Sequence, residues 1–205
     1  MSLYAKYVWA PILDWCMRQP PVLEHRQKVV PLARGRVLEI GIGSGLNLPY
    51  YDTGRVEKVW GLEPCPELRA AAGARVADAR LQVEILDAAG EAVPMDDRFF
   101  DTVLTTWTMC SIADVPRALR EMRRVLKPEG RLVFAEHGLS AEAGVASWQN
   151  RLNPLWRVVS GGCNMNRRIA PLVRDAGFRF EALETAYLEG PRILTYTYWG
   201  TAVPA

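Results

Sequence analysis

The chain has 205 residues, of which 49% are hydrophobic and 23% charged, and its net charge is +2. This length and apolar fraction predict a single α/β domain over residues 1–205. The weak charge gives no reason to expect a nucleic-acid partner, and the densest basic residues recur at the spacing of a solvated helix face. No uncharged run approaches the roughly 20 residues of a membrane-spanning helix.

The cysteines are spread along the chain and none forms a Cys-x-x-Cys pair. They are Cys16, Cys65, Cys110 and Cys163. This spacing fails the patterns of structural zinc sites and of dense disulfide frameworks. We therefore expect no metal site and a reduced, cytoplasmic location. Residues 1–20 lack the features of a secretory signal, which agrees with that location.

The N-terminal segment is rich in aromatic residues, among them Tyr4, Tyr7, Trp9 and Trp15. We interpret residues 1–30 as part of a substrate cap over the active site, with contact between this segment and a membrane surface as the alternative. His25 lies in an early amphipathic helix of the segment, and we expect it to be structural.

The first expected strand runs straight into a loop with glycines at alternate positions. The strand is 36–40 and the glycines are Gly41, Gly43 and Gly45. Glycine is needed where the backbone turns with positive φ or approaches a ligand closely. Glu39 stands just before this loop, and a second strand, 58–62, ends in Glu63 about 20 residues further on. A carboxylate there can accept hydrogen bonds from a ribose diol, so the pattern predicts a nucleotide-containing ligand; a purely structural turn is the alternative.

The residue at the front of the loop distinguishes two kinds of ligand. A dinucleotide site places a pyrophosphate at the helix N-terminus, whereas the carboxylate of Glu39 would repel pyrophosphate and suits an ammonium group. Glu39 and its glycines resemble motif I of the class I methyltransferases. The resemblance implies S-adenosylmethionine as the cofactor, with its amino-acid end near Glu39.

Apolar strands alternate with helical stretches along the rest of the chain, which is typical of a parallel sheet with helices on both faces. Further strands are expected at 82–86, 101–106, 131–136, 178–185 and 191–202, and helices near 47 and over 66–77, 113–126 and 168–176. Gly190-Pro191 indicates a short turn, and so antiparallel pairing of the last two strands. The expected fold is α/β, a Rossmann-like doubly wound seven-stranded sheet, mostly parallel, with one antiparallel edge strand.

One connection is far longer than usual for such a fold. The segment 138–166 contains apolar residues at helical spacing, namely Trp148, Leu152, Leu155, Trp156 and Val159. Long connections at the carboxyl ends of strands usually build the ligand crevice of an open α/β sheet. We therefore interpret 138–166 as the second part of the substrate cap, with ordinary core packing as the alternative.

The resemblance to class I methyltransferases implies further cofactor contacts. The acid that ends the third strand, Asp87, would bind the adenine amino group, with backbone of the next residues on the ring. The end of the fourth strand would line the methionine and adenosine pockets, whereas Asp101 at its start is expected to be structural. The implied cofactor residues are Glu39, Gly41, Gly43, Gly45, Asn47, Leu48, Glu63, Pro64, Asp87, Ala88, Ala89, Thr105, Thr106 and Trp107.

Two residues are candidates for a direct role in catalysis. His137 ends the fifth strand beside the fourth, where an imidazole can act as a base near neutral pH; a structural histidine is the alternative. Cys163 lies in a glycine-flanked loop of the long connection and is the second candidate. Cys110 is expected to be a small buried hydrophobic residue.

The last third of the chain narrows the resemblance. Glu136-His137, Trp148, Pro154-Leu155-Trp156 and Gly162-Cys163-Asn164 resemble the methyltransferase-like thiol S-methyltransferases of animals and their small bacterial relatives, and Thr106, Cys110-Ser111 and Ala89-Gly90-Glu91 match as well. The animal enzymes carry an N-terminal membrane anchor, which we do not expect here.

The resemblance implies methylation of the sulfur of a small thiol such as sulfide, methanethiol or another alkyl or aryl thiol. The thiol must first lose its proton, and His137 could take it without a metal. The alternatives are N-methylation of a phospholipid head group, C-methylation of a quinone precursor, and a noncatalytic S-adenosylmethionine-binding partner.

Overall fold

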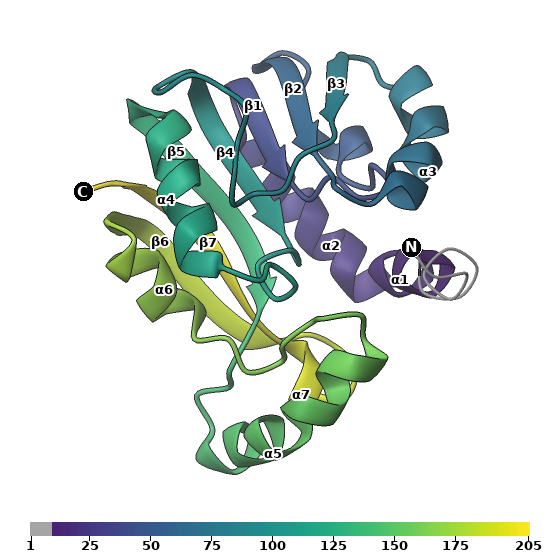
Figure 1. Ribbon diagram of the computed structural model, residues 1–205, viewed down its shortest axis with the longest axis vertical. Coiled ribbons are helices and arrows are strands. Elements are labelled where there is room, and N and C mark those ends of the chain that lie inside the picture. Colours follow the sequence, from purple (N-terminus) through teal and green to yellow (C-terminus); the bar gives the residue numbers. More distant parts are fainter. Residues whose placement is uncertain (1–9) are drawn as a thin grey trace.

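The computed structural model describes residues 10–205, and the expectations for Tyr4, Tyr7 and Trp9 lie outside this range. One seven-stranded sheet organises the chain, with strand order β3-β2-β1-β4-β5-β7-β6 (Figure 1). The strands are β1 (Gly35–Ile40), β2 (Val56–Leu62), β3 (Gln82–Leu86), β4 (Phe100–Thr106), β5 (Leu126–His137), β6 (Phe178–Tyr187) and β7 (Tyr196–Pro204). The helices are α1 (Ala10–Met17), α2 (Pro20–Val29), α3 (Pro66–Ala77), α4 (Val115–Val125), α5 (Ala143–Val159), α6 (Ile169–Asp175) and α7 (Arg192–Thr195).

The first five strands pair in parallel, and β7 runs antiparallel to both of its neighbours, β5 and β6. The expected seven-stranded, mostly parallel sheet is confirmed, as is the antiparallel pairing of the last two strands. The reversed strand lies one place in from the edge, because β6 takes the edge position first and the chain returns through α7 to place β7 between β6 and β5.

The sheet is doubly wound because alternate residues of its strands face two separate cores. Leu38 of β1 belongs to the core that α4 and α6 cover, whereas its neighbour Val37 belongs to the core under the end of α2. Helix α4 is strongly amphipathic, with buried residues at intervals of three and four. The side chain of Asp114 caps its first turn by accepting a hydrogen bond from the backbone of Arg117 at 3.0 Å.

The prediction of a helix near residue 47 is wrong. Only a 3-10 turn, η3 (Leu48–Tyr50), follows the glycine loop; a second such turn, η2 (Val30–Leu32), extends α2. Tyr51 is already extended, with ψ of 136°, and its hydroxyl donates to Glu39. The carboxylate of Asp52 then accepts a hydrogen bond from Gly54 two residues on, a turn that leads directly into β2.

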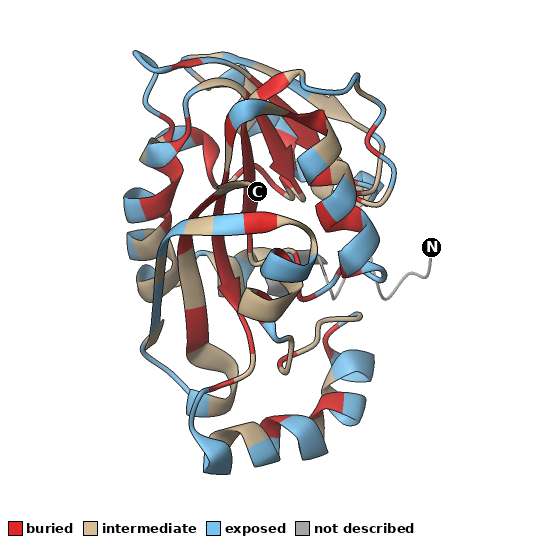
Figure 2. Cartoon of the chain, turned by 90° about the vertical axis from the view of Figure 1, so that its left-hand side faces the viewer, coloured by how far each residue is buried: buried red, intermediate tan, exposed pale blue. Residues whose placement is uncertain are grey.

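The long connection between β5 and α6 holds α5, which lies at the lower end of the molecule away from the sheet (Figure 1). Its buried residues are the polar Gln149 and Asn153, and its outer side is largely exposed (Figure 2). Trp148 and Leu155, which belong to the expected apolar helical face, are 55% and 67% exposed, so ordinary core packing does not account for them. Within residues 10–205, no helix combines the length and the apolar character that crossing a membrane requires.

Candidate functional site

A cavity of about 610 Å³ opens at the carboxyl ends of β1, β2 and β4. The predicted cofactor residues that line it are Glu39, Gly41, Gly43, Glu63, Pro64, Ala88, Ala89, Thr106 and Trp107. The others lie outside its lining, and they are Gly45, Asn47, Leu48, Asp87 and Thr105. The crevice therefore forms where the parallel strands end, as in other open α/β sheets.

The glycine loop forms one wall of the cavity, and all three of its glycines have a backbone conformation that other residues rarely adopt. Gly41, Gly43 and Gly45 have φ of +69°, +57° and +81°, values that favour glycine. A Cβ on Gly41 would also lie 2.4 Å from the methyl carbon of Thr108. The loop thus brings the ends of β1 and β4 into close contact and leaves its backbone open to the cavity.

Glu63 holds this loop from the end of β2. Its carboxylate accepts hydrogen bonds from the backbone N–H of Gly43 at 3.0 Å and of Cys65 at 2.9 Å. The side chain is buried, and burial raises its pKa despite these donors. Each carboxylate oxygen keeps further acceptor capacity, so Glu63 can also accept hydrogen bonds from a ligand in the cavity.

Glu39 lies fully buried at the floor of the cavity. One of its oxygens accepts from Asn47 Nδ2 at 2.8 Å and the other from the hydroxyl of Tyr51 at 2.7 Å. Burial raises its pKa from 4.5 to about 7. Asn47 does not line the cavity itself, but it fixes the carboxylate that does.

Arg26 of α2 is a functional candidate that the sequence analysis missed. Its guanidinium donates to Asn47 Oδ1 at 2.5 Å and to Thr106 Oγ1 at 3.0 Å, and it lies 5.0 Å from the ring centroid of Trp107. The side chain lines the cavity, and its Nε has no hydrogen-bond partner among the described residues. Burial lowers its pKa to about 10, so the guanidinium stays charged at neutral pH. The cavity therefore places a cation beside the buried carboxylate of Glu39.

Helix α1 covers part of the same cavity. Asp14 and Met17 line it, and the hydroxyl of Ser44 in the glycine loop donates to the Asp14 carboxylate. Arg75 of α3 forms an ion pair with Asp14 at 3.7 Å. His25 of α2 packs edge-on against Trp199 instead and lies outside the cavity lining.

Asp87 lies apart from the cavity. Its exposed carboxylate forms a two-pronged ion pair with Arg69, at 2.7 and 2.8 Å. Its role at the adenine ring stays a prediction. Asp101 accepts a hydrogen bond from the backbone of Arg36 and pairs with Lys127, which is the arrangement expected of a structural acid.

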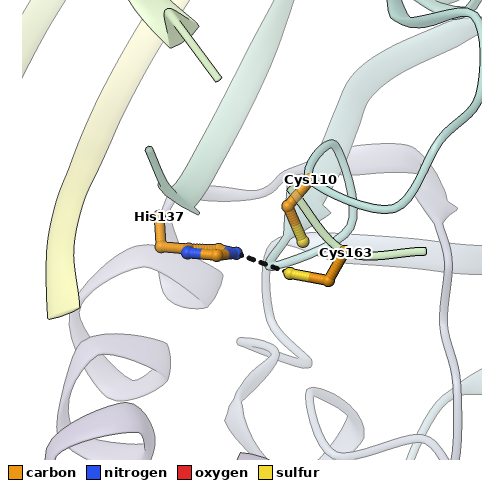
Figure 3. A group of neighbouring side chains, drawn as sticks. All are labelled: Cys110, His137 and Cys163. Carbon is orange, nitrogen blue, oxygen red and sulfur yellow. Dashed lines mark hydrogen bonds between the residues drawn. The ribbon is translucent and has the colours of Figure 1, made fainter. Parts of the chain in front are cut away.

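A second group of reactive side chains lies beside the cavity. Cys110, His137 and Cys163 come from the loop after β4, the end of β5 and the loop after α5, and their side chains point toward one another (Figure 3). His137 Nε2 is 3.1 Å from the Cys163 sulfur, and the three potential ligand atoms lie within 4.8 Å of one another. None of the three lines the cavity, but Gly161 and Ser111, close to them in sequence, do.

The electrostatics of this cluster favour an ionised Cys163. Its contact with Cys110 and its hydrogen bond with His137 lower the pKa of the Cys163 thiol, whereas the contact with Cys163 and burial raise the pKa of the Cys110 thiol. Burial alone would lower the pKa of His137, but its hydrogen bond with Cys163 and the nearby Glu136 raise the pKa overall. Each shift depends on the other, because a negative charge on Cys163 and a proton on His137 stabilise one another across their 3.1 Å contact.

Glu136 fixes the loop that carries Cys110. Its carboxylate accepts hydrogen bonds from the backbone N–H of Thr108 at 3.0 Å and of Met109 at 3.1 Å, and from Thr105 Oγ1 at 2.7 Å. Thr105 thus faces Glu136 rather than the cavity. Trp107 lies in the sequence between Thr105 and Thr108, which both contact Glu136. It adopts φ of +51°, a conformation that is rare for a bulky residue and that often accompanies a functional site.

Comparison with known proteins identifies the family. A methyltransferase-domain family profile matches residues 38–134, which hold the glycine loop, Glu63 and the strands around the cavity. Thiol S-methyltransferase TMT1A of Homo sapiens is 32% identical over 166 residues, which cover 78% of this chain and 66% of the human protein. The chain belongs to the class I S-adenosylmethionine-dependent methyltransferases.

The solved structures agree with this fold. A complex between the Haloferax volcanii Trm112 methyltransferase activator and a methyltransferase contains a chain with a TM-score of 0.72, at 21% identity and 96% coverage of both chains. The fold of this methyltransferase is therefore common to proteins of quite different sequence. The Haloferax volcanii complex matches it in fold alone.

Other relatives of the methyltransferase act on different acceptors. Phosphatidylethanolamine N-methyltransferase of Cereibacter sphaeroides is 33% identical over 50% of this chain and 51% of its own. Demethylmenaquinone methyltransferase of Thermus thermophilus is 37% identical over 56% and 54%. The rat thiol S-methyltransferase TMT1B matches over 62% of its length, so a third or more of each of these relatives lies outside the match.

Proposed function

We propose that this methyltransferase methylates the sulfur of a small thiol, such as sulfide, methanethiol or another alkyl or aryl thiol. The observation that carries the proposal is the meeting of His137 and Cys163 beside the cofactor cavity. A thiol acceptor must be ionised before it can react, because the thiolate is the nucleophile. The similarity to thiol S-methyltransferases over 78% of the chain supports the same acceptor class.

The charges of the cavity fit the cofactor. S-adenosylmethionine supplies, when bound, a methyl group activated on a sulfonium sulfur. The carboxylate of Glu39 suits the ammonium group of its amino-acid end, and the guanidinium of Arg26, with its unpaired Nε, suits the carboxylate. Glu63 suits the ribose hydroxyls. In this proposal Arg26 joins the cofactor residues that the sequence motifs predict.

His137 and Cys163 form the end of the acceptor pocket at which the thiol is ionised in this proposal. The sulfur of Cys163 already carries negative charge, so a second negative sulfur, that of the acceptor, needs a positive charge close by. Arg167 supplies this charge, since it interacts electrostatically with both Cys110 and Cys163. The residues of α1 and the loop at Gly161 that line the cavity would keep water from the reacting atoms. Segments 1–30 and 138–166 act as the substrate cap.

A second acceptor class is favoured by one specific observation. Four apolar side chains of α5 are all more than half exposed, namely Trp148, Leu155, Val158 and Val159. Such a face suits contact with a lipid surface. N-methylation of a phospholipid head group, or C-methylation of a quinone precursor, is therefore the alternative.

A product screen separates these proposals. The purified protein is incubated with methyl-labelled S-adenosylmethionine and, in parallel, with sulfide, methanethiol, an aromatic thiol, ethanolamine lipid vesicles and a quinone precursor. We expect label in the methylated thiols, and roughly 3- to 80-fold less label with the Glu63→Ala protein at the cofactor concentration that gives the wild type half its rate. Label in the lipid or ring product with no thiol methylated would move the protein to the alternative class.

A further inference from the structure

The cluster of Cys110, His137 and Cys163 has a ligand set that the family motif does not require. Two sulfurs and one imidazole nitrogen, all within 4.8 Å of one another, come from the loop after β4, the loop after α5 and the end of β5 (Figure 3). Cys110 and His137 are buried and Cys163 is half-buried. Thiolate and imidazole are the ligands that zinc prefers among the common biological metals.

The spacing of the ligand atoms matches zinc after small movements of the side chains. Tetrahedral zinc with bonds of 2.0–2.3 Å holds its ligand atoms about 3.5–3.8 Å apart. The observed separation of His137 Nε2 and Cys163 Sγ is 3.1 Å, and every other pair lies within 4.8 Å. Shifts of less than about 1 Å in flexible side chains would therefore complete the geometry.

Backbone hydrogen bonds hold the two cysteine loops together, so the cluster does not depend on the thiols alone. Asn164 donates to the carbonyl oxygen of Cys110 from both its backbone N–H and its side-chain Nδ2, each at 2.9 Å. Glu136 fixes the other side of the Cys110 loop. Such outer contacts orient the ligands of metal sites.

The surrounding charge also suits a metal with one open position. Two thiolates balance a divalent cation, and Arg167, which interacts with both cysteines, offsets one further negative ligand. Ser111, whose hydroxyl is 3.5 Å from the Cys110 sulfur, lines the cofactor cavity, so the cluster lies one residue behind the cavity wall. Three protein ligands and one open position are the arrangement of catalytic zinc sites.

We propose that Cys110, His137 and Cys163 bind a zinc ion whose open position takes the acceptor thiol as a thiolate. On binding, the sulfur of the thiol bonds to zinc and its proton leaves to solvent, so no oxidant or reductant is involved. The ion thereby lowers the pKa of the acceptor as it does for bound water. The second half of this proposal rests on the proposed thiol methylation, whereas zinc binding itself does not.

Metal binding can be tested without measuring methyltransferase activity. The wild-type protein, purified under reducing conditions, is analysed for zinc content and then titrated with Co²⁺, whose visible bands and thiolate charge-transfer band report tetrahedral sulfur ligation. We expect about one metal per chain. Replacing a ligand, as in Cys110→Ser, His137→Ala or Cys163→Ser, should weaken zinc by more than about 100-fold, beyond the roughly 10–100-fold effect of outer contacts.

Two control variants give the losses of metal affinity against which the ligand variants are compared. Cys16→Ser removes a half-buried cysteine of α1 outside the cluster and should leave the metal affinity unchanged. Asn164→Ala keeps all three ligands but loosens the loops, so its loss should fall in the range of outer contacts. Because Cys163 lies in a half-buried loop, Cys163→Ser decides the result if Cys110→Ser fails to fold.

The outcomes separate the two proposals. Three results would overturn the zinc site. The first is that the protein binds neither zinc nor cobalt although its thiols are free, and the second is a Cys110–Cys163 disulfide in the protein as purified. The third is a loss of metal affinity in Cys16→Ser equal to that of the ligand variants. If the cluster binds zinc but no thiol is methylated, the zinc site is supported and the proposed thiol acceptor is wrong. If thiol methylation is undiminished after the metal is removed by a chelator, the thiol acceptor is supported and the proposed role of zinc in the reaction is wrong.

Discussion

The imidazole of His137 lies 3.1 Å from the sulfur of Cys163, although 26 residues separate the two along the chain. The end of β5 places the imidazole, and the loop after α5 places the thiol. Neither residue lines the cofactor cavity. In our proposal, cofactor binding and acceptor ionisation therefore depend on separate sets of side chains, and substitutions should be able to affect one without the other.

Glu63→Ala tests the cofactor site. The ribose hydroxyls would lose an acceptor and the glycine loop would lose the anchor of Gly43, so affinity for S-adenosylmethionine should fall by about 1–3 kcal/mol. Calorimetry on the folded variant measures it. Asp87→Ala is the matched comparison, and its loss should be smaller because the Asp87 carboxylate is exposed and paired with Arg69. An equal loss would instead support the adenine contact that the family resemblance implies.

Arg26→Met tests the recognition of the amino-acid end. If the guanidinium meets the cofactor carboxylate, the variant should bind S-adenosylmethionine about 2–5 kcal/mol more weakly, the cost of removing one partner of a buried charge pair. Methylthioadenosine, which lacks that carboxylate, should bind with nearly unchanged affinity. Equal weakening of both ligands would show that Arg26 only supports Asn47 and Thr106.

The buried Glu39 predicts a pH dependence of stability in the cofactor-free protein. Its pKa is raised by burial from 4.5 to about 7, so between these values the folded chain holds a proton that the unfolded chain has lost. Stability should therefore be greatest at low pH and decline as the pH rises from about 4.5 to 7, by up to about 3 kcal/mol from this residue.

Glu39→Gln should remove that part of the decline. Denaturant unfolding at pH 5 and pH 7.5 gives the free energy of unfolding of both proteins, and Glu136, whose pKa burial also raises to about 7, titrates in both. The comparison thus isolates Glu39. The same decline in variant and wild type would mean that Glu39 is ionised in the folded protein well below neutral pH.

Much of the cavity wall could be predicted from the sequence. The Glu39 loop and the Glu63 strand end carry local patterns, and parallel strands bring their carboxyl ends together whatever lies between them. Arg26 was missed because it lies before the motif, in a helix whose charged residues resemble a solvated face. Folding brings it into hydrogen-bond contact with Asn47 and Thr106, which are 21 and 80 residues away along the chain.

The interior of segment 138–166 was harder to predict because its buried side chains are polar. The apolar spacing of α5 drew attention to Trp148 and Leu155, but these are exposed and Gln149 is buried. Likewise, the three-residue cluster has no sequence signature, since 27 and 26 residues separate its members. Only the sheet topology places the Cys110 loop beside the end of β5.

Gln149→Ala tests the cap. The buried side chain donates to the carbonyl oxygens of Gly138, Met165 and Ile193 and accepts from the N–H of Ser140. Removing it leaves these groups unpaired, which should destabilise the protein by about 2–4 kcal/mol and loosen segment 138–166. Acceptor turnover should fall while cofactor affinity stays unchanged.

The neighbouring Trp148→Ala is the control for the cap. This side chain is 55% exposed, so its loss should change the free energy of unfolding by no more than about 0.5 kcal/mol. Denaturant unfolding, calorimetry with the cofactor and thiol turnover are measured for both variants. Unchanged turnover in a folded Gln149→Ala protein would remove segment 138–166 from the acceptor site.

His137→Ala tests the ionisation of the acceptor. Turnover of a small thiol at neutral pH should fall by about 10²–10⁴-fold, the range for loss of a proton-accepting group. Raising the pH should restore part of the rate, because more of the thiol is then already ionised. Cofactor affinity is the control and should not change, since His137 lies outside the cavity lining. A wild-type rate and pH profile would exclude His137 from the reaction.

Cys163→Ser distinguishes the two ways in which His137 can act. If His137 takes the proton directly, the acceptor brings its own sulfur and the loss of Cys163 should cost clearly less than the loss of His137. If both hold zinc, the two variants should lose similar activity, and Cys110→Ser should join them, because each removes one ligand of the same ion. The rates of the three variants over a range of pH, measured with and without added zinc, therefore assign the role of His137.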